Sequence, residues 1–293
     1  MGSIVVSKVQ RMASLLLLSS FCFPTLATGL EVDLNGFRLQ QFLDVADKSL
    51  GKPFKTMDAG GMVANLYHLD GDAYMVVGHL KKYEHNIALL QVTGKSSNVL
   101  PFRGLALGDA KEKVVQVFGK PDKVEIEANE NPKLTLYSYN GRNYSFEFDE
   151  QDHLYSILID TTSDLMTKTD NAESEWNDFK SALLSKDFVK ILDTLKPDVE
   201  IYKSGKTLSI DTKYSEFQKN PNKEFIAALI GEKNSVLQEI SQSEPVQEFR
   251  LTEKIGMGIV YKFPKGKILE EIVFFPFNGK YRVYEISFRE KAK

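Results

Sequence analysis

Two short stretches decide the fold of the first half of the chain: Leu66-Tyr67-His68-Leu69-Asp70-Gly71 and, 70 residues later, Leu136-Tyr137-Ser138-Tyr139-Asn140-Gly141. Each ends in an Asp-Gly or Asn-Gly pair, the strongest short sequence signal for a β-hairpin. A second matching pair precedes them at nearly the same spacing: Leu50-Gly51-Lys52-Pro53 and Phe118-Gly119-Lys120-Pro121. Matches that keep both order and spacing predict an internal duplication.

Each repeat is predicted to be a short helix followed by a three-stranded antiparallel meander. In the second repeat, Asp109 and Glu112 have the spacing of a capping box, and Gly119 suits the end of a helix. Alternating apolar residues predict strands before and after Asn140-Gly141 and again from Leu154. In the first repeat a helix is expected from Leu39 to Gly51, and strands are expected at 62–69, 73–80 and 86–92. Helices on one sheet face would close an α+β layer.

The second repeat carries a set of residues that is typical of a known family. They are Gly104-Leu105-Ala106-Leu107-Gly108-Asp109, Val114, Phe118-Gly119-Lys120-Pro121, Tyr137, Tyr144, Phe146-Glu147-Phe148-Asp149 and Leu154. This pattern resembles the SmpA/OmlA-like repeat of small outer-membrane assembly lipoproteins. Two copies in tandem, over about residues 36–160, are similar to the secreted β-lactamase inhibitor proteins. The resemblance implies protein binding without catalysis, although the first copy departs from it at Asp58-Ala59-Gly60-Gly61.

The amino terminus has the pattern of a secretory signal peptide. Lys8 and Arg11 precede a short apolar run at 15–23, and small residues follow up to Ala27. A signal peptide over residues 1–27 would make the mature protein secreted or periplasmic, and which of the two stays open. Two alternatives are a buried core helix and a lipid anchor at Cys22, and the bulky Phe21 disfavours the second.

Composition excludes several classes of protein. The chain has 293 residues, of which 26% are charged and 42% hydrophobic, as in ordinary globular proteins of two domains. It carries 37 Lys and Arg against 40 Asp and Glu, so no basic excess indicates nucleic-acid binding. One cysteine cannot form an intramolecular disulfide, and no segment after the signal is predicted to span a membrane.

A polar stretch divides the chain into two predicted domains. The tandem α+β repeat is assigned to residues 30–162, a linker to 163–172, and a second α+β domain to 173–293. In the second domain, helices are expected around Trp176–Leu183, Phe188–Leu195 and 223–240. Strand patterns occur at 199–210 and near 246–253, 257–263, 268–276 and 280–289. The predicted architecture is helices packed on a curved antiparallel sheet.

The second domain carries two patterns of its own. The first is Trp176, Phe179, Ala182, Leu183, Asp187 and Leu192, and the second is the closing run Phe277-Asn278-Gly279-Lys280-Tyr281-Arg282-Val283-Tyr284-Glu285-Ile286. Both are similar to nuclear transport factor two-like cone folds. In that family a curved sheet wraps a helix and often encloses an apolar pocket.

No motif for catalysis or metal binding stands out. The four histidines, His68, His79, His85 and His153, lack the cysteine partners and convergent spacing typical of zinc sites. No nucleophile elbow, phosphate loop or dinucleotide loop occurs, so no cofactor or metal is expected. Asn143-Tyr144-Ser145 is a formal glycosylation acceptor within a strand pattern.

Aromatic residues therefore carry the functional hypotheses. The leading one is a non-enzymatic protein that binds a partner of the cell envelope or exterior through the sheet face of its repeat. Its candidate residues are Tyr67, Tyr74, Tyr137 and Tyr144. The alternative is a small-molecule binder or cryptic enzyme with an apolar pocket in the second domain, lined by Trp176, Phe179, Tyr202, Tyr261 and Phe274. A purely structural envelope protein is a third class that the sequence permits.

Overall fold

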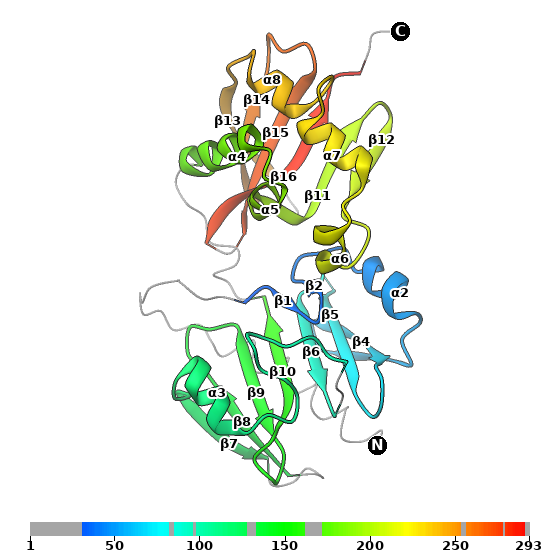
Figure 1. Cartoon of the computed structure of the whole chain (residues 1–293), viewed down its shortest axis with the longest axis vertical. Coiled ribbons are helices and arrows are strands. Elements are labelled where there is room, and N and C mark those ends of the chain that lie inside the picture. Colours follow the sequence, from blue (N-terminus) through cyan, green and yellow to red (C-terminus); the bar gives the residue numbers. More distant parts are fainter. Residues whose placement is uncertain are drawn as a thin grey trace. The chain divides into compact units, whose positions relative to one another are not determined.

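The structure is a computed structural model that describes residues 31–81, 85–95, 98–127, 133–161, 172–252, 256–277 and 279–290. The chain divides into two compact units, Met1–Thr162 and Ser163–Lys293 (Figure 1). The predicted fold class is confirmed, because both units combine helices with largely antiparallel sheets. The predicted signal peptide with Cys22, and residues 163–171 of the predicted linker, lie outside the described residues.

The first unit is built from two copies of a helix followed by four strands. The first copy comprises α2 (Asp44–Leu50), β3 (Lys55–Ala59), β4 (Met62–His68), β5 (Tyr74–Leu80) and β6 (Leu89–Thr93). The second comprises α3 (Lys111–Phe118), β7 (Lys123–Glu127), β8 (Leu134–Ser138), β9 (Tyr144–Phe148) and β10 (Leu154–Asp160). A small hairpin of β1 (Asp33–Leu34) and β2 (Phe37–Arg38) precedes both.

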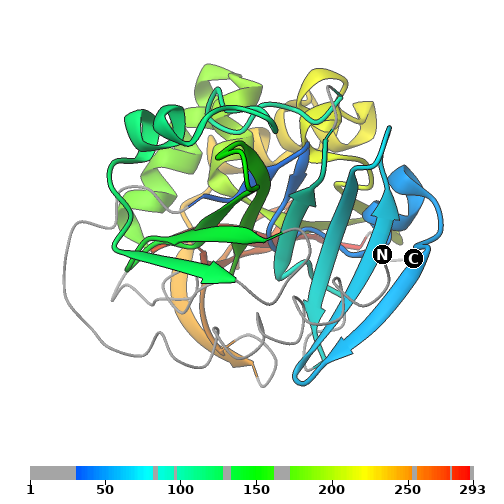
Figure 2. The ribbon, with the colours of Figure 1, turned by 90° about the horizontal axis from the view of Figure 1, so that it is seen from below.

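The two copies join into one eight-stranded sheet of order β3-β4-β5-β6-β10-β9-β8-β7. Their last strands, β6 and β10, pair antiparallel in the middle, so the sheet reads alike from either edge. Figure 2 shows the cyan strands of the first copy and the green strands of the second within this strongly twisted layer. The order of the strands in one copy is thus the mirror of the order in the other, on either side of the β6–β10 pair.

The repeated glycines have the same backbone role in both copies. Gly51 and Gly119 each end a helix at φ 82°, where their N–H groups donate to carbonyls four residues earlier. Gly71 and Gly141 turn the β4–β5 and β8–β9 connections at φ 73° and 66°. A residue with a Cβ is strained at these positive φ values, which explains why glycine recurs at both pairs of positions.

Three predictions for this unit need correction. Each copy has a fourth strand, β3 or β7, that the sequence pattern did not indicate. The first helix begins at Asp44, not near Leu39, because residues 37–42 form β2 and an isolated bridge to Asn86. Asp109 does not cap α3: its carboxylate accepts the N–H of Ala106 at 2.7 Å, and Ala110 stands at the N-cap.

Within its described residues, the second unit comprises five helices and a six-stranded sheet. The helices are α4 (Glu173–Ser185), α5 (Phe188–Thr194), α6 (Tyr214–Lys219), α7 (Lys223–Ile230) and α8 (Val236–Ile240). The strands are β11 (Leu195–Lys203), β12 (Lys206–Ser209), β13 (Val246–Thr252), β14 (Gly256–Lys262), β15 (Leu269–Phe277) and β16 (Lys280–Phe288), in the order β12-β11-β16-β15-β14-β13. The β11–β16 pair is parallel, which corrects the expectation of a wholly antiparallel sheet.

Candidate functional site

Cross-strand pairing defines the two faces of the eight-stranded sheet. One row of directly opposed residues runs through Tyr67, Met75, Val92, Ile157, Phe146 and Tyr137. Opposed residues of antiparallel strands point to the same face. This is the helix face: the Tyr67 hydroxyl donates to Asp47 of α2 at 2.7 Å, and the ring of Phe118 in α3 lies 4.9 Å from that of Phe146.

The other face, here called the opposite face, contains the row Tyr74, Thr93, Ser156, Glu147 and Leu136. The four candidate tyrosines are divided between the two faces, and they do not form one exposed surface. Tyr67 is fully buried and Tyr144 is 7% exposed, both on the helix face. Tyr137 is half-buried there, edge-on to Phe148 at 4.7 Å. Tyr74, which is half-buried, is the one candidate on the opposite face.

One extra residue explains why the sequence comparison misplaced Tyr144. In the first copy His68 pairs with Tyr74, whereas in the second Ser138 pairs with Ser145. The segment between these two paired residues is therefore one residue longer in the second copy than in the first. Ser145, not Tyr144, is the structural equivalent of Tyr74, because a shift of one residue turns a side chain to the other face.

Tyr67 links the sheet to α2, so removal of its hydroxyl should lower the stability of the protein. Burial and the hydrogen bond to Asp47 raise the pKa of Tyr67 above its usual value. We expect Tyr67→Phe to lower the free energy of unfolding by about 2 kcal/mol, since the lost bond ends on a carboxylate. Tyr137→Phe, at the equivalent position of the second copy, should change it by less than about 0.5 kcal/mol. Equal effects in urea denaturation would contradict this assignment.

The opposite face differs in chemistry between the two copies. In the first copy it is apolar: Met57, Met62, Ala64, Leu66, Val76 and Leu89 form a cluster with Leu158 from β10, and Tyr74 and Leu80 pack against its edge. In the second copy, the same face carries Ser138, Ser145, Glu147 and Ser156 beside the buried Leu134 and Leu136. An antiparallel sheet that is covered by helices on one face normally presents polar residues on the other. The first copy is therefore not patterned for contact with water.

A buried polar cluster marks the boundary between these two halves. Ser156 accepts hydrogen bonds from the Gln91 side chain at 2.7 Å and the Thr93 hydroxyl at 3.1 Å. The three side chains are almost fully buried where β6 meets β10. Their polar atoms satisfy one another, so the cluster is a structural feature of the junction.

Asp160 ends β10 opposite Leu89, and burial raises the pKa of its carboxyl to about 7. Folding then favours the protonated form, so the stability that it contributes is present below pH 4 and is lost as the pH rises through 7. We expect Asp160→Asn to raise the melting temperature at pH 8 and to leave it unchanged at pH 4. A melting temperature that differs from wild type by the same amount at both pH values would contradict this titration.

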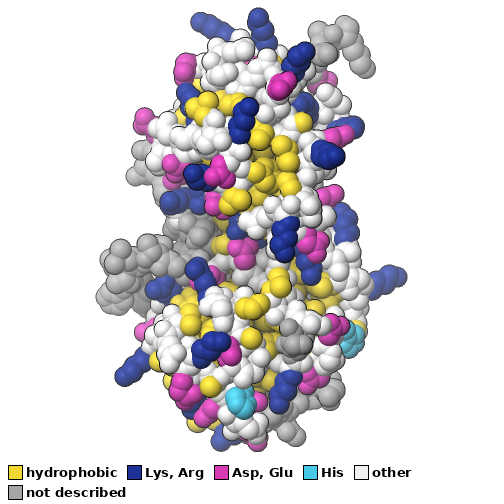
Figure 3. Space-filling view, viewed as in Figure 1, with side chains coloured by type: hydrophobic (Ala, Val, Ile, Leu, Met, Phe, Trp, Pro, Cys, Tyr) yellow, Lys and Arg dark blue, Asp and Glu magenta, His cyan; other side chains and the backbone are white. Residues whose placement is uncertain are grey.

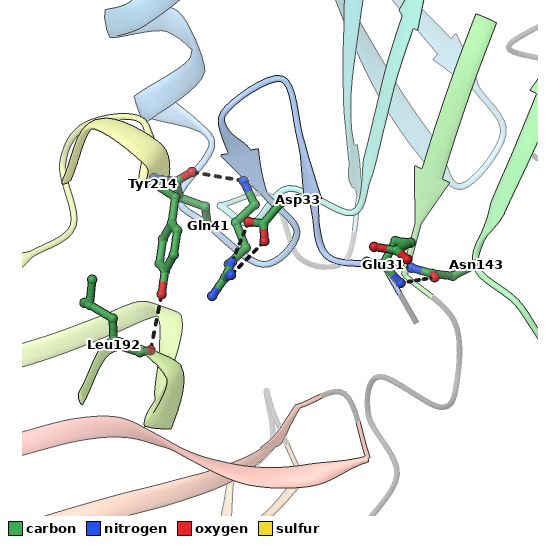
Figure 4. Close-up of polar contacts among 7 residues, drawn as sticks. Glu31, Asp33, Gln41, Asn143, Leu192 and Tyr214 are labelled. Carbon is green, nitrogen blue, oxygen red and sulfur yellow. Dashed lines mark hydrogen bonds and ion pairs between the residues drawn. The ribbon is translucent and has the colours of Figure 1, made fainter. Parts of the chain in front are cut away.

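Asn143, the formal glycosylation acceptor, has its side chain buried in the fold (Figure 4). Its amide nitrogen donates to the carbonyls of Glu31 and Asp160 at 2.5 and 2.8 Å, and its oxygen accepts the N–H of Glu31 at 2.7 Å. Since both groups of this amide are hydrogen-bonded, Asn143 holds chain segments together and is not accessible for glycosylation.

The predicted pocket of the second unit is filled by its own aromatic residues. Trp176, Phe179, Tyr261 and Phe274 are at most 8% exposed. The rings of Trp176 and Tyr261 stack at 4.5 Å, and Phe274 lies edge-on to Tyr261 at 5.4 Å. Four of the five candidates are thus core residues between α4 and the sheet. Tyr202 is 38% exposed and donates its hydroxyl to Glu200, away from the aromatic core.

A shallow groove of about 240 Å³ does occur in the second unit, but in another place. Its lining residues are Lys203, Ser204, Lys206, Leu208, Glu224 and Ala227. The Lys203 amine donates to the Asn234 carbonyl at 2.5 Å, and Lys206 pairs with Glu224 at 3.5 Å. Both amines are therefore committed within the protein.

The described residues contain neither a candidate metal site nor a helix that could span a membrane. Within the described ranges, no three His, Cys, Asp or Glu side chains converge as a metal site would require. Of the helices that the structure describes, none has the length and apolar character to cross a bilayer. On the face drawn in Figure 3, acidic and basic side chains interleave without separating by sign.

Comparison with known proteins gives few matches. No family model matches the chain, and no curated protein matches it. A solved structure of a DUF4309 family protein (YjgB) from Bacillus subtilis aligns with 54% of this chain and 95% of its own, at 13% identity and a TM-score of 0.30. A candidate β-lactamase inhibitor protein from Streptococcus mutans aligns with 40% of this chain and 80% of its own, at 14% identity and a TM-score of 0.18.

Proposed function

We propose that this chain is a non-enzymatic binding protein that engages a protein partner through the opposite face of its first repeat. The observation that carries the proposal is the half-buried pair Tyr74 and Leu80 at the edge of an apolar cluster, on a sheet face that turns away from α2 and α3. The cluster itself, Met57, Met62, Leu66, Val76 and Leu158, is at most 8% exposed. A sheet face in contact with water normally carries polar residues, so the apolar composition of this face indicates that it is covered.

The rim of this cluster supplies the residues that a partner would meet first. Tyr74 and Leu80 are half-buried at its edge, and His68 is exposed beside Tyr74. Aromatic residues that surround an apolar centre are enriched in protein interfaces. Of the four tyrosines that the sequence suggested, only Tyr74 belongs to this surface.

The cellular compartment in which the protein works is part of the same proposal. The pattern at residues 1–27 supports export, so we place the partner in the cell envelope or outside the cell. Neither a filled aromatic core nor a shallow groove with paired lysines supports a small-molecule substrate.

Native mass spectrometry of the tagged chain from its own host tests the proposal. We expect a stoichiometric protein partner that is retained by the wild type and lost from Tyr74→Glu. Ser145→Glu places the same charge at the equivalent position of the second copy and should keep the partner. A retained small molecule without a protein, or equal loss from both variants, would contradict the proposed face.

A further inference from the structure

The β7 edge of the eight-stranded sheet carries exposed apolar residues. β7 pairs only with β8 among the described strands, and the alternate residues Val124 and Ile126 are 53% and 61% exposed. Both lie on the helix face, since Val124 pairs with Tyr137. The residues that alternate with them, Lys123 and Glu125, point to the opposite face. An edge strand with free backbone groups and an apolar side is a template for another strand.

The equivalent edge of the first copy has less of this character. Phe54, which matches Val124 in position, is 46% exposed, but its ring stacks on that of His68 at 4.0 Å. The pairs Thr56–Asn65 and Ile126–Thr135 occupy matching positions in the two copies, so threonine stands where β7 has isoleucine. The Thr56 hydroxyl is also hydrogen-bonded to Asn65 at 2.8 Å, and Asp58 is paired with Lys81 at 2.6 Å. On its helix face β3 thus presents Thr56 and Asp58, which disfavour pairing, where β7 presents Val124 and Ile126. The contrast makes β7 the edge that is suited to association.

We propose that β7 pairs antiparallel with β7 of a second copy, centred on Glu125, to make a symmetric dimer. In this register Val124 lies opposite the second copy's Ile126, and Lys123 lies opposite its Glu127. Apolar residues thus meet on the helix face, and opposite charges meet on the other.

Other registers fit less well. A shift by one residue sets apolar side chains opposite charged ones. A shift by two residues places Glu125 opposite Glu127, or else leaves Ile126 opposite Asp122. In the proposed register the two Glu125 carboxylates do face each other. Each has its own Lys123 amine at 2.9 Å, which offsets their repulsion.

A cysteine at position 125, which lies on the two-fold axis of the proposed dimer, tests this register directly. Directly opposed residues have Cα atoms about 4.5–5.5 Å apart, within the range that a disulfide spans. The full chain with Cys22→Ser has no other cysteine. We expect Glu125→Cys in that background to form a disulfide-linked dimer on oxidation. Lys55→Cys, at the matched position on β3, should stay monomeric.

Side-chain substitutions test the same dimer without crosslinking. Analytical ultracentrifugation of the full chain should show a concentration-dependent dimer of modest affinity, as a small interface implies. Ile126→Lys should abolish it, while Thr56→Lys should not. Lys123→Glu should weaken it, and adding Glu127→Lys should restore it, because the charges are exchanged across the two-fold axis.

Several results would overturn the proposal. They are a wild-type monomer at every concentration, crosslinking of Lys55→Cys equal to that of Glu125→Cys, or a dimer that survives Ile126→Lys. A monomer that recruits a different protein to β7 would also overturn it. Because both edges are exposed, we expect every variant to fold, and circular dichroism checks this.

Discussion

Phe274→Ala is expected to lower the free energy of unfolding of the second unit by about 3–5 kcal/mol. The ring is fully buried and touches Trp176, Phe179 and Tyr261, so its loss leaves a void among aromatic neighbours. A chain with a genuine pocket at this place would tolerate the change, because the space would already be open to a ligand.

Fluorescence of Trp176, the one tryptophan of the chain, follows this unfolding during urea titration. Tyr261→Phe is the matched control. It keeps the ring and removes a hydroxyl that is buried without a hydrogen-bond partner among the described residues. We expect the control to be as stable as the wild type or slightly more stable. A decrease in the free energy of unfolding of less than about 1 kcal/mol for Phe274→Ala would contradict a packed core here and support the pocket hypothesis.

Lys196→Met is expected to lower stability by a similar amount, about 3–5 kcal/mol. Lys196 and Asp198 lie on β11 and are 1% and 4% exposed, and the amine is 3.4 Å from the carboxylate and 5.0 Å from the centre of the Tyr284 ring. Removal of the lysine leaves the buried carboxylate of Asp198 close to Tyr284, whose other acidic neighbours are Glu200 and Glu285. Burial and the charges of Asp198, Glu200 and Glu285 raise the pKa of that tyrosine to about 12.

The double variant Lys196→Met/Asp198→Leu separates the energy of the pair from the cost of keeping one buried charge after the other is removed. Apolar replacement of both partners should lose far less stability than either single change. The exposed pair Lys206–Glu224 serves as a control, and its removal should alter stability by less than about 1 kcal/mol. Additive single effects at Lys196 and Asp198 would show that the two charges do not interact.

Much of the fold follows from local sequence. The turns at Asp70-Gly71 and Asn140-Gly141 predict their hairpins, and in the second unit the strands predicted near 246–253, 257–263, 268–276 and 280–289 correspond to β13–β16. β3 escaped prediction because it lacks apolar alternation, whereas β7 has it at Val124 and Ile126 and was missed because the run is only five residues long. The parallel pairing of β11 with β16 joins distant segments, and no local pattern reports it.

The candidate site was harder to predict for a specific physical reason. The face on which a strand residue lies depends on the pairing across each turn, and one extra residue between the paired Ser138 and Ser145 places Tyr144 on the helix face. Burial of Tyr67 under α2 likewise depends on tertiary packing. The apolar pattern of Met62, Leu66 and Val76 was visible in the sequence, but only the structure shows that these residues turn away from both helices of their unit.

A photo-crosslinking amino acid at position 74 tests the binding face most directly. Incorporated in place of Tyr74 in the native host, it should capture one protein partner reproducibly. The same amino acid in place of Ser145, the structural equivalent in the polar second copy, should capture little. Capture of that partner at 74 but not at 145 is the result that we predict. Crosslinks confined to the chain itself, or equal capture at both positions, would contradict the proposed function.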